Sequence, residues 1–306
     1  MKKKAIITSI LTVAVLLVSA VAIFAKNVDA EQETAKKALS SDEKEAVASD
    51  TEKRIDKAKS KMLEAVDDKH TAYEKMLNSM DYFETVQGSF EMKELGEVSS
   101  VEYAADFQGN YAEENVSGEN VSFQTVTNNG ETITYDHKAR NYLKTPVMEE
   151  DDFVAELPVE ERTQVDDETG QPVWYYRTNM TGFSYAKESL FPQERAFGYL
   201  YDFESWDITG KEETAGRTCW RIEGKLSGSY SEKLNVKSYV FFVDTQTGCL
   251  LKYEGYDSQG GLTEYIETKE IEFDAPLAIA YEEAVIPEGY TDWAAESLKL
   301  LNGENE

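Results

Sequence analysis

Residues 244–261, DTQTGCLLKYEGYDSQGG, contain the side chains of this sequence that most resemble a reactive site, because Asp244 and Asp257 flank Cys249. Aspartates and a cysteine can ligate a metal, and a thiolate can act as a nucleophile. Each aspartate is followed four residues later by a glycine, however, which is the spacing of a tight turn. Cys249 has no adjacent histidine or lysine to lower its pKa. We therefore predict that the stretch is scaffold, with two hairpin turns.

Two S-x-x-K patterns, Ser184–Lys187 and Ser41–Lys44, could place a nucleophile beside a base. Neither is accompanied by the S-D-N or K-T-G motif that completes such sites in β-lactamases, and so short a pattern arises by chance. The carboxylate pairs Glu149–Glu150 and Asp166–Asp167 fall in polar loops, where no burial would raise a pKa for general acid catalysis. The sequence therefore predicts that the protein is not an enzyme.

The sequence contains few side chains that could bind a metal ion. The chain has two histidines, His70 and His137, and two cysteines, so a zinc site would need distant carboxylates. No D-x-D-x-D-G loop is present for calcium. We expect no metal site and no cofactor.

The charge of the chain excludes several partners. Fifty-nine acidic against 31 basic side chains give a formal charge of −28, which repels phosphate backbones and anionic lipid headgroups. We expect no nucleic-acid partner and interpret the acidity as a solvated surface.

The N-terminus predicts export. Three lysines precede an uncharged apolar run from Ala5 to Ala25, which exceeds the ~7–15 residues of a signal core and approaches the ~20 that span a bilayer. Residues 1–30 are therefore a signal peptide or a membrane anchor, with a candidate cleavage site at Val28–Ala30, and residues 31–50 are a polar spacer. The positive-inside rule places the chain after Lys26 outside the membrane, either anchored or secreted.

An exported chain permits a disulfide, and Cys219 and Cys249 are the candidates. If the strand Val236–Val243 lies between their strands, the separation of ~9.6 Å exceeds the ~4.4–6.8 Å that a disulfide needs. The bond could form only where that middle strand ends, near Asp244. The sequence leaves open whether the two cysteines are bonded.

The hydrophobic pattern changes period along the chain. A capping box at Ser49 and apolar residues at helical spacing predict one long helix from about Ser49 to Met80. From Val101 to Tyr111, VEYAADFQGNY alternates apolar and polar residues, which predicts one strand of an antiparallel sheet with one covered face. Asn129–Gly130 has the composition of a tight hairpin.

A helical region at about 185–205 separates this first group of strands from a second, which runs from RTCWRIEGKL to LTEYIETKEIEF. The chain should therefore be an α+β protein with a single, highly curved antiparallel sheet of about eight or more strands. Residues 51–285 are expected to form this domain, and residues 286–306 a short C-terminal helix and tail.

Two groups of turn and strand residues carry a family resemblance: Asn129–Thr132 with Tyr135–Asp136, and Val243–Asp257 with Gly260–Gly261. Over roughly Ile55 to Leu277 the chain resembles the LolA-like superfamily of lipoprotein carriers. The resemblance implies an open antiparallel half-barrel with helices over its concave face, an apolar cavity that holds acyl chains, and no catalysis.

We predict that apolar residues of the strands and of the helical region line this cavity. They are Phe90, Tyr103, Phe107, Tyr111, Leu190, Phe191, Phe197, Leu200, Trp220, Phe242 and Tyr253. The predicted function is an extracytoplasmic binding protein for a lipid, an acyl chain or a lipoprotein. The alternative is an envelope sensor that binds the extracellular segment of a partner protein. The sequence identifies neither the ligand nor the oligomeric state.

Overall fold

The computed structural model describes residues 68–147, 154, 158, 161–165, 172–177, 181–277 and 284–301. The chain divides into two compact units, and the second, which begins at Asp68, contains every described residue. The predicted signal peptide or anchor and the spacer lie outside the described residues. Among the helices that are described, none is long and apolar enough to cross a membrane.

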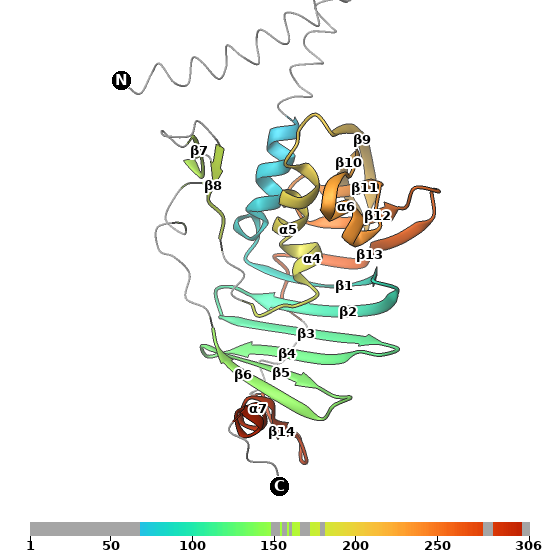
Figure 1. The fold of residues 1–306 in the computed structure, drawn as a ribbon. Helices are drawn as coiled ribbons and strands as arrows, with labels where there is room; N and C mark the ends of the chain where they lie inside the picture. Colours follow the sequence, from blue (N-terminus) through green and yellow to red (C-terminus); the bar gives the residue numbers. More distant parts are fainter. Residues whose placement is uncertain are drawn as a thin grey trace, which may run out of the picture. The chain divides into compact units, whose positions relative to one another are not determined.

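Most of the described chain forms one open sheet of twelve strands, in the order β14-β6-β5-β4-β3-β2-β1-β13-β12-β11-β10-β9 (Figure 1). The prediction of a large, mainly antiparallel sheet is confirmed, although β14 pairs parallel with β6. The strands are β1 (Thr85–Glu94), β2 (Glu97–Asp106), β3 (Tyr111–Gly118), β4 (Ser122–Asn128), β5 (Glu131–Asp136), β6 (Asn141–Pro146), β9 (Trp206–Thr214), β10 (Arg217–Lys225), β11 (Ser238–Asp244), β12 (Leu250–Tyr256), β13 (Leu262–Phe273) and β14 (Thr291–Asp292). A separate pair consists of β7 (Thr163–Val165) and β8 (Pro172–Trp174).

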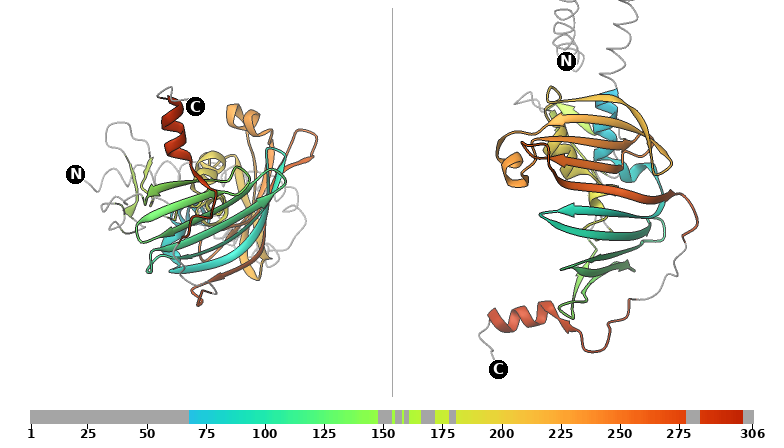
Figure 2. Two further views of the ribbon diagram at one scale, coloured as in Figure 1. Left: turned by 90° about the horizontal axis from the view of Figure 1, so that it is seen from below. Right: turned by 90° about the vertical axis from the view of Figure 1, so that its right-hand side faces the viewer.

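Short helices pack against one face of this sheet, which curls around them (Figure 2). We call this the concave face and the opposite one the convex face. The helices over the concave face are residues 68–77, η1 (Ser79–Tyr82), α4 (Lys187–Leu190), α5 (Gln193–Arg195) and η3 (Ala196–Leu200). The other helices in the described part of the chain are α6 (Gly228–Leu234), which follows β10, and α7 (Trp293–Leu301), which follows β14.

The predicted helix from about Ser49 to Met80 is described only over residues 68–77 and continues as the 3-10 turn η1. Its first part lies outside the described residues, so the structure does not support a long N-terminal helix. Within the described part, Tyr73, Met76 and Leu77 are buried in the main core, as the apolar spacing predicts.

The prediction of one strand over residues 101–111 is wrong, because the chain reverses between β2 and β3. Asp106 closes the turn by accepting the backbone N–H of Gly109 at 2.8 Å. After the reversal Tyr111 pairs with Asp106, and both lie on the convex face. Tyr103 lies three residues before Asp106 on the same strand. Because side chains alternate between faces along a strand, Tyr103 points to the opposite, concave face. The turn therefore changes which residues of the stretch share a face.

The two edges of the sheet differ. Along β9 the register with β10 shifts, because Arg221 pairs with Gly210 and Ile222 pairs with Ile208, so that Thr209 forms a bulge. At the other edge, β14 covers only the first two residues of β6, Asn141 and Tyr142.

Candidate functional site

The segment from Thr181 to Ser205, here called the insert, carries α4, α5 and η3 and covers the concave face. Glu114 of β3 binds the first part of the insert through hydrogen bonds. This carboxylate is 1% exposed and accepts the N–H groups of Ser184, Tyr185 and Ala186 as well as the hydroxyl of Ser184. A buried carboxylate with four donors is well satisfied, so Glu114 anchors the insert to the sheet.

The S-x-x-K pattern at Ser184–Lys187 is used structurally. Ser184 donates to Glu114, and Lys187 donates to Glu194 at 2.9 Å. Burial lowers the pKa of Lys187, but the hydrogen bond to Glu194 and the nearby carboxylates outweigh it, so that the net pKa is raised. A lysine with a raised pKa is a poor general base.

Where the insert meets the concave face of the sheet, tyrosines and charged side chains from both form a buried network. Tyr253 donates to Glu264 at 3.0 Å, and the hydroxyls of Tyr199 and Tyr253 are 2.7 Å apart. The guanidinium of Arg195 lies over the ring of Tyr253 at 4.6 Å and is paired with Glu188. Burial raises the pKa of Glu264 and of Glu188, and Arg195 opposes both shifts.

Several buried polar atoms around this interface have no hydrogen-bond partner among the described residues. They are Tyr73 Oη, Tyr103 Oη, Trp220 Nε1, Glu264 Oε1 and Thr268 Oγ1. Tyr103 and Trp220 are among the site residues predicted from the sequence, whereas Glu264, Glu114 and Arg195 are not. Glu114 could have been identified as a charged residue at a position of β3 that points to the concave face. That inference requires the turn at residues 107–110 to be recognised first.

Ten of the eleven predicted cavity residues belong to the hydrophobic core or pack against it, and all of these except the buried Phe242 lie on the concave face. Seven of those on the concave face are buried, whereas Phe107 and Phe197 are half-buried. Two residues face the other way. Tyr111 lies on the convex face, and so does Phe242, because its neighbour Phe241 contacts Tyr253 on the concave face.

The two cysteines are buried, unbonded thiols. Strand β11 lies between their strands, which is the arrangement in which regular pairing disfavours a bond, and Cys219 pairs with Asp244 at the end of β11. Burial raises the pKa of Cys219 to about 12 and also raises that of Cys249. Neither thiol is therefore activated as a nucleophile.

The histidines have structural partners: His70 stacks on Phe203, and His137 bonds the hydroxyl of Tyr290 through Nδ1 at 2.8 Å. Within the described ranges, no three His, Cys, Asp or Glu side chains are placed to hold a metal ion. Asp244 instead caps the turn after β11 and pairs with Arg217, as the scaffold interpretation of residues 244–261 requires.

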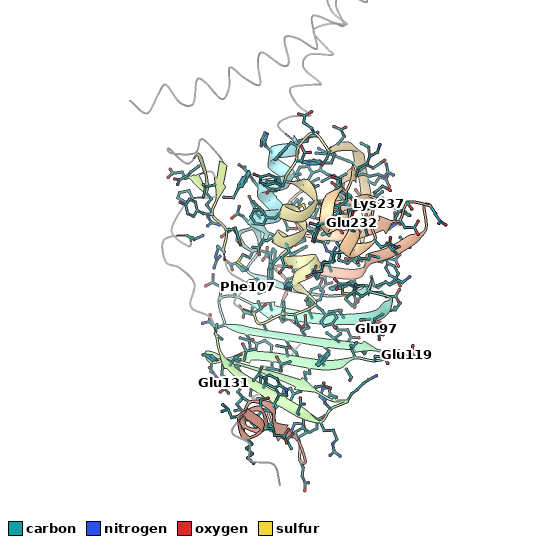
Figure 3. All side chains as sticks on the ribbon, viewed as in Figure 1. Glu97, Phe107, Glu119, Glu131, Glu232 and Lys237 are labelled. Carbon is teal, nitrogen blue, oxygen red and sulfur yellow. The ribbon has the colours of Figure 1, made fainter. Side chains whose placement is uncertain are left out.

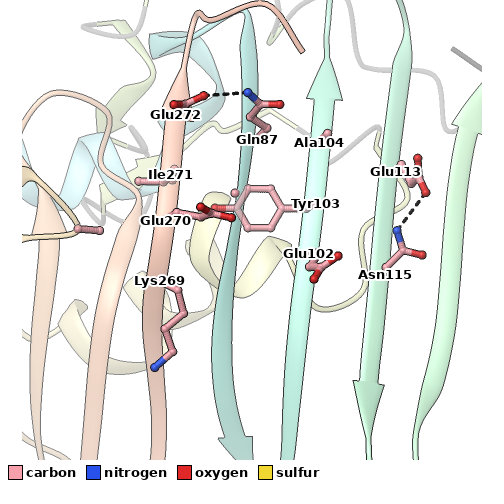
Figure 4. A pocket seen from close by; sticks show the side chains of 12 residues that line it. Gln87, Glu102, Tyr103, Ala104, Glu113, Asn115, Lys269, Glu270, Ile271 and Glu272 are labelled. Carbon is pink, nitrogen blue, oxygen red and sulfur yellow. Dashed lines mark hydrogen bonds between the residues drawn. The ribbon is translucent and has the colours of Figure 1, made fainter. Parts of the chain in front are cut away.

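Residues of the described ranges line cavities on the sheet. A groove of about 570 Å³ crosses the convex face of β13, β1, β2 and β3 (Figure 4). Its side chains include Glu102, Glu270 and Glu272 but only one lysine, Lys269. A smaller cavity of about 270 Å³, here called the seam cavity, lies between the β2–β3 turn, the β4–β5 turn and Thr181, where the insert begins.

An open, mainly antiparallel sheet with helices on its concave face is the architecture that the family resemblance implied. No protein-family model and no curated protein matches the sequence. Several solved protein structures, in contrast, match the structure of this chain. An uncharacterized conserved protein from Thermus thermophilus is 11% identical over 70% of this chain and 95% of its own, with a TM-score of 0.37.

MucB in the MucA/MucB complex of Pseudomonas aeruginosa is 16% identical over 70% of this chain and 60% of the other, with a TM-score of 0.37. A LolA superfamily protein from Nitrosomonas europaea is 8% identical over 69% of this chain and 94% of its own, with a TM-score of 0.22. The chain is similar to each of these three structures at 8–16% identity. What it binds has to follow from its own side chains.

Proposed function

We propose that the protein is a non-catalytic binding protein of the cell envelope whose concave face takes a hydrophobic ligand: a lipid, an acyl chain or a lipoprotein. The apolar N-terminal run supports a position outside the membrane, with the protein either anchored or secreted.

The observation that carries this proposal is the set of buried polar atoms without partners at the concave face, such as Tyr103 Oη, Trp220 Nε1 and Glu264 Oε1. Each unsatisfied buried group costs about 1–3 kcal/mol, and permanently closed cores contain few of them. Such groups are tolerated where an interface opens to water, or where an uncharged polar group of a lipid, such as a hydroxyl or an ester, supplies the missing partner. Tyr103 and Trp220 belong to the core that the insert covers, which favours a site there.

The chemistry of this face suits an apolar guest. The core beneath the insert is rich in aromatic side chains, and each methylene that a guest buries there contributes ~0.8 kcal/mol. Arg195, the buried cation of the insert, is already paired with Glu188, so affinity would come from apolar contact more than from a charged headgroup.

A titration with the fluorescent fatty acid dansyl-undecanoic acid tests the proposal. The wild-type protein should bind the probe, and Phe107→Asp, which places a charge beside the concave core, should abolish binding. Phe242→Asp is the matched control, because the same substitution on the convex face should leave affinity unchanged. Circular dichroism verifies that each variant is folded. A wild-type protein that does not bind the probe would overturn the proposal.

The second candidate is a sensor that binds the extracellular segment of a partner protein, and the convex groove supports it. The groove is of ligand size, and its carboxylates exceed its one lysine, which favours a basic segment. A lysine–serine repeat peptide should bind at low salt, and the double variant Glu102→Gln/Glu270→Gln should weaken this binding. Equal affinity of the variant and the wild type would eliminate the candidate.

A further inference from the structure

We infer that the seam cavity is the entrance through which an acyl chain reaches the concave face, and that Phe107 is the side chain that the acyl chain must displace. The inference rests on the proposed hydrophobic-ligand function and adds where the ligand enters.

The lining of the seam cavity suits an uncharged chain. Asp106 is its one charged lining residue, and Oδ1 of that carboxylate already accepts the N–H of Gly109. Apolar surface comes from Phe107, Ala112 and Val147, and much of the remaining wall is turn backbone. An acyl chain can occupy such a space without desolvating an unpaired charge.

Phe107 separates this cavity from the core. It lies at the end of β2, below the helices (Figure 3). Its ring is 5.7 Å from that of Phe83 and 6.1 Å from that of Phe191, the residue that follows α4. Phe83 and Phe191 are buried, whereas Phe107 is half-buried. A rotation of the Phe107 side chain would therefore bring the cavity into direct contact with the core beneath the insert.

The opposite ends of the same strands are less suitable. Glu97 and Glu119 lie there (Figure 3), and Glu97 accepts the backbone and side-chain N–H groups of Asn120 at 2.8 Å. An acyl chain that passed there would have to displace or desolvate carboxylates, which is costly. The polarity of the two strand ends thus favours entrance at Phe107.

Stopped-flow binding of dansyl-undecanoic acid to the full chain tests this inference. Phe107→Ala removes the obstructing ring, so the association and dissociation rate constants should both rise ~3- to 10-fold, with little change in Kd, as for a removed conformational gate. Val147→Trp fills the seam cavity at a half-buried position and should lower both rate constants. A purely structural role for Phe107 would instead change Kd.

Glu97→Ala, at the other strand ends, is the control and should leave both rate constants within about twofold. If the wild type binds the probe but neither Phe107→Ala nor Val147→Trp changes the rate constants, the entrance is elsewhere, while the proposed function stands. If the wild type does not bind the probe at all, the proposed function and the entrance fail together. Val147→Trp keeps the test decisive if Phe107→Ala does not fold.

Discussion

The concave and convex faces are built from alternate residues of the same strands, yet neighbouring carboxylates serve different purposes on them. Glu114, on the concave face, is buried and accepts four hydrogen bonds from the insert. Glu113, on the convex face, accepts hydrogen bonds from Tyr111, Asn115 and Gln124 of its own face. The first joins two parts of the fold, and the second arranges a surface. The face, more than the residue type, decides what a carboxylate does.

The largest expected difference between the faces concerns aromatic residues. Phe90→Ala removes a ring that is 1% exposed in the concave core and should lower the free energy of unfolding by about 3–5 kcal/mol. Phe242→Ala removes a convex ring that is 7% exposed and is covered in part by the flexible side chain of Lys252, so it should cost less, about 2–3 kcal/mol. Urea unfolding followed by tryptophan fluorescence measures both. Equal losses would mean that the two faces do not differ in packing.

The neighbouring carboxylates provide the next comparison. Glu114→Gln exchanges a charged acceptor for an amide whose N–H₂ group meets backbone donors, and should cost about 2–3 kcal/mol. Glu113→Gln should cost less than about 1 kcal/mol, because its partners are only partly buried. Unfolding in urea gives both values. A loss for Glu113→Gln as large as that for Glu114→Gln would contradict the anchoring role of Glu114.

A smaller effect depends on pH. Because burial raises the folded-state pKa of Glu264, the folded protein binds this proton more tightly than the unfolded chain does. The associated stability is present below the unfolded pKa and is lost as the pH rises through the folded pKa. From about pH 8 to about pH 5, the wild type should therefore gain stability relative to Glu264→Gln. Arg195, Glu188, Glu94 and Tyr253 also act on this carboxyl and stay unchanged in the comparison.

The smallest effect belongs to the convex groove. Glu102→Gln removes an exposed carboxylate and should change the free energy of unfolding by no more than about 0.5 kcal/mol. Thermal unfolding by circular dichroism measures this. A large loss would show that the groove is structurally required, and would weaken its interpretation as a surface free to bind a partner.

The alternation of residues and the turn composition were sufficient to predict one large antiparallel sheet with a helical segment between two groups of strands. Asp244 and Asp257 behave as turn residues because each accepts backbone N–H groups from within four positions along the chain. Such local interactions are visible in a sequence. The hairpin at residues 107–110 was missed because its apolar residues happen to continue the alternation of β2, which concealed the reversal.

The candidate site was less predictable for a related reason. Its aromatic members could be listed from the pattern, but Tyr111 and Phe242 were assigned to the wrong face. For Tyr111 the cause is the missed turn. For Phe242 it is two successive aromatics, Phe241 and Phe242, of which only one can face the insert. The contacts of Arg195 and Glu264 join residues far apart in the chain, and no local pattern marks them.

The unequal edges of the sheet bear on how the protein avoids aggregation. An open sheet offers two rows of backbone groups to which another chain could add a strand. On β9 the bulge at Thr209 interrupts that row, and on β6 the short β14 occupies one end while Lys144 and Pro146 are exposed at the other. Bulges, lysines and prolines all disfavour the addition of a strand. A sheet of twelve strands can therefore stay dispersed at high concentration without closing into a barrel.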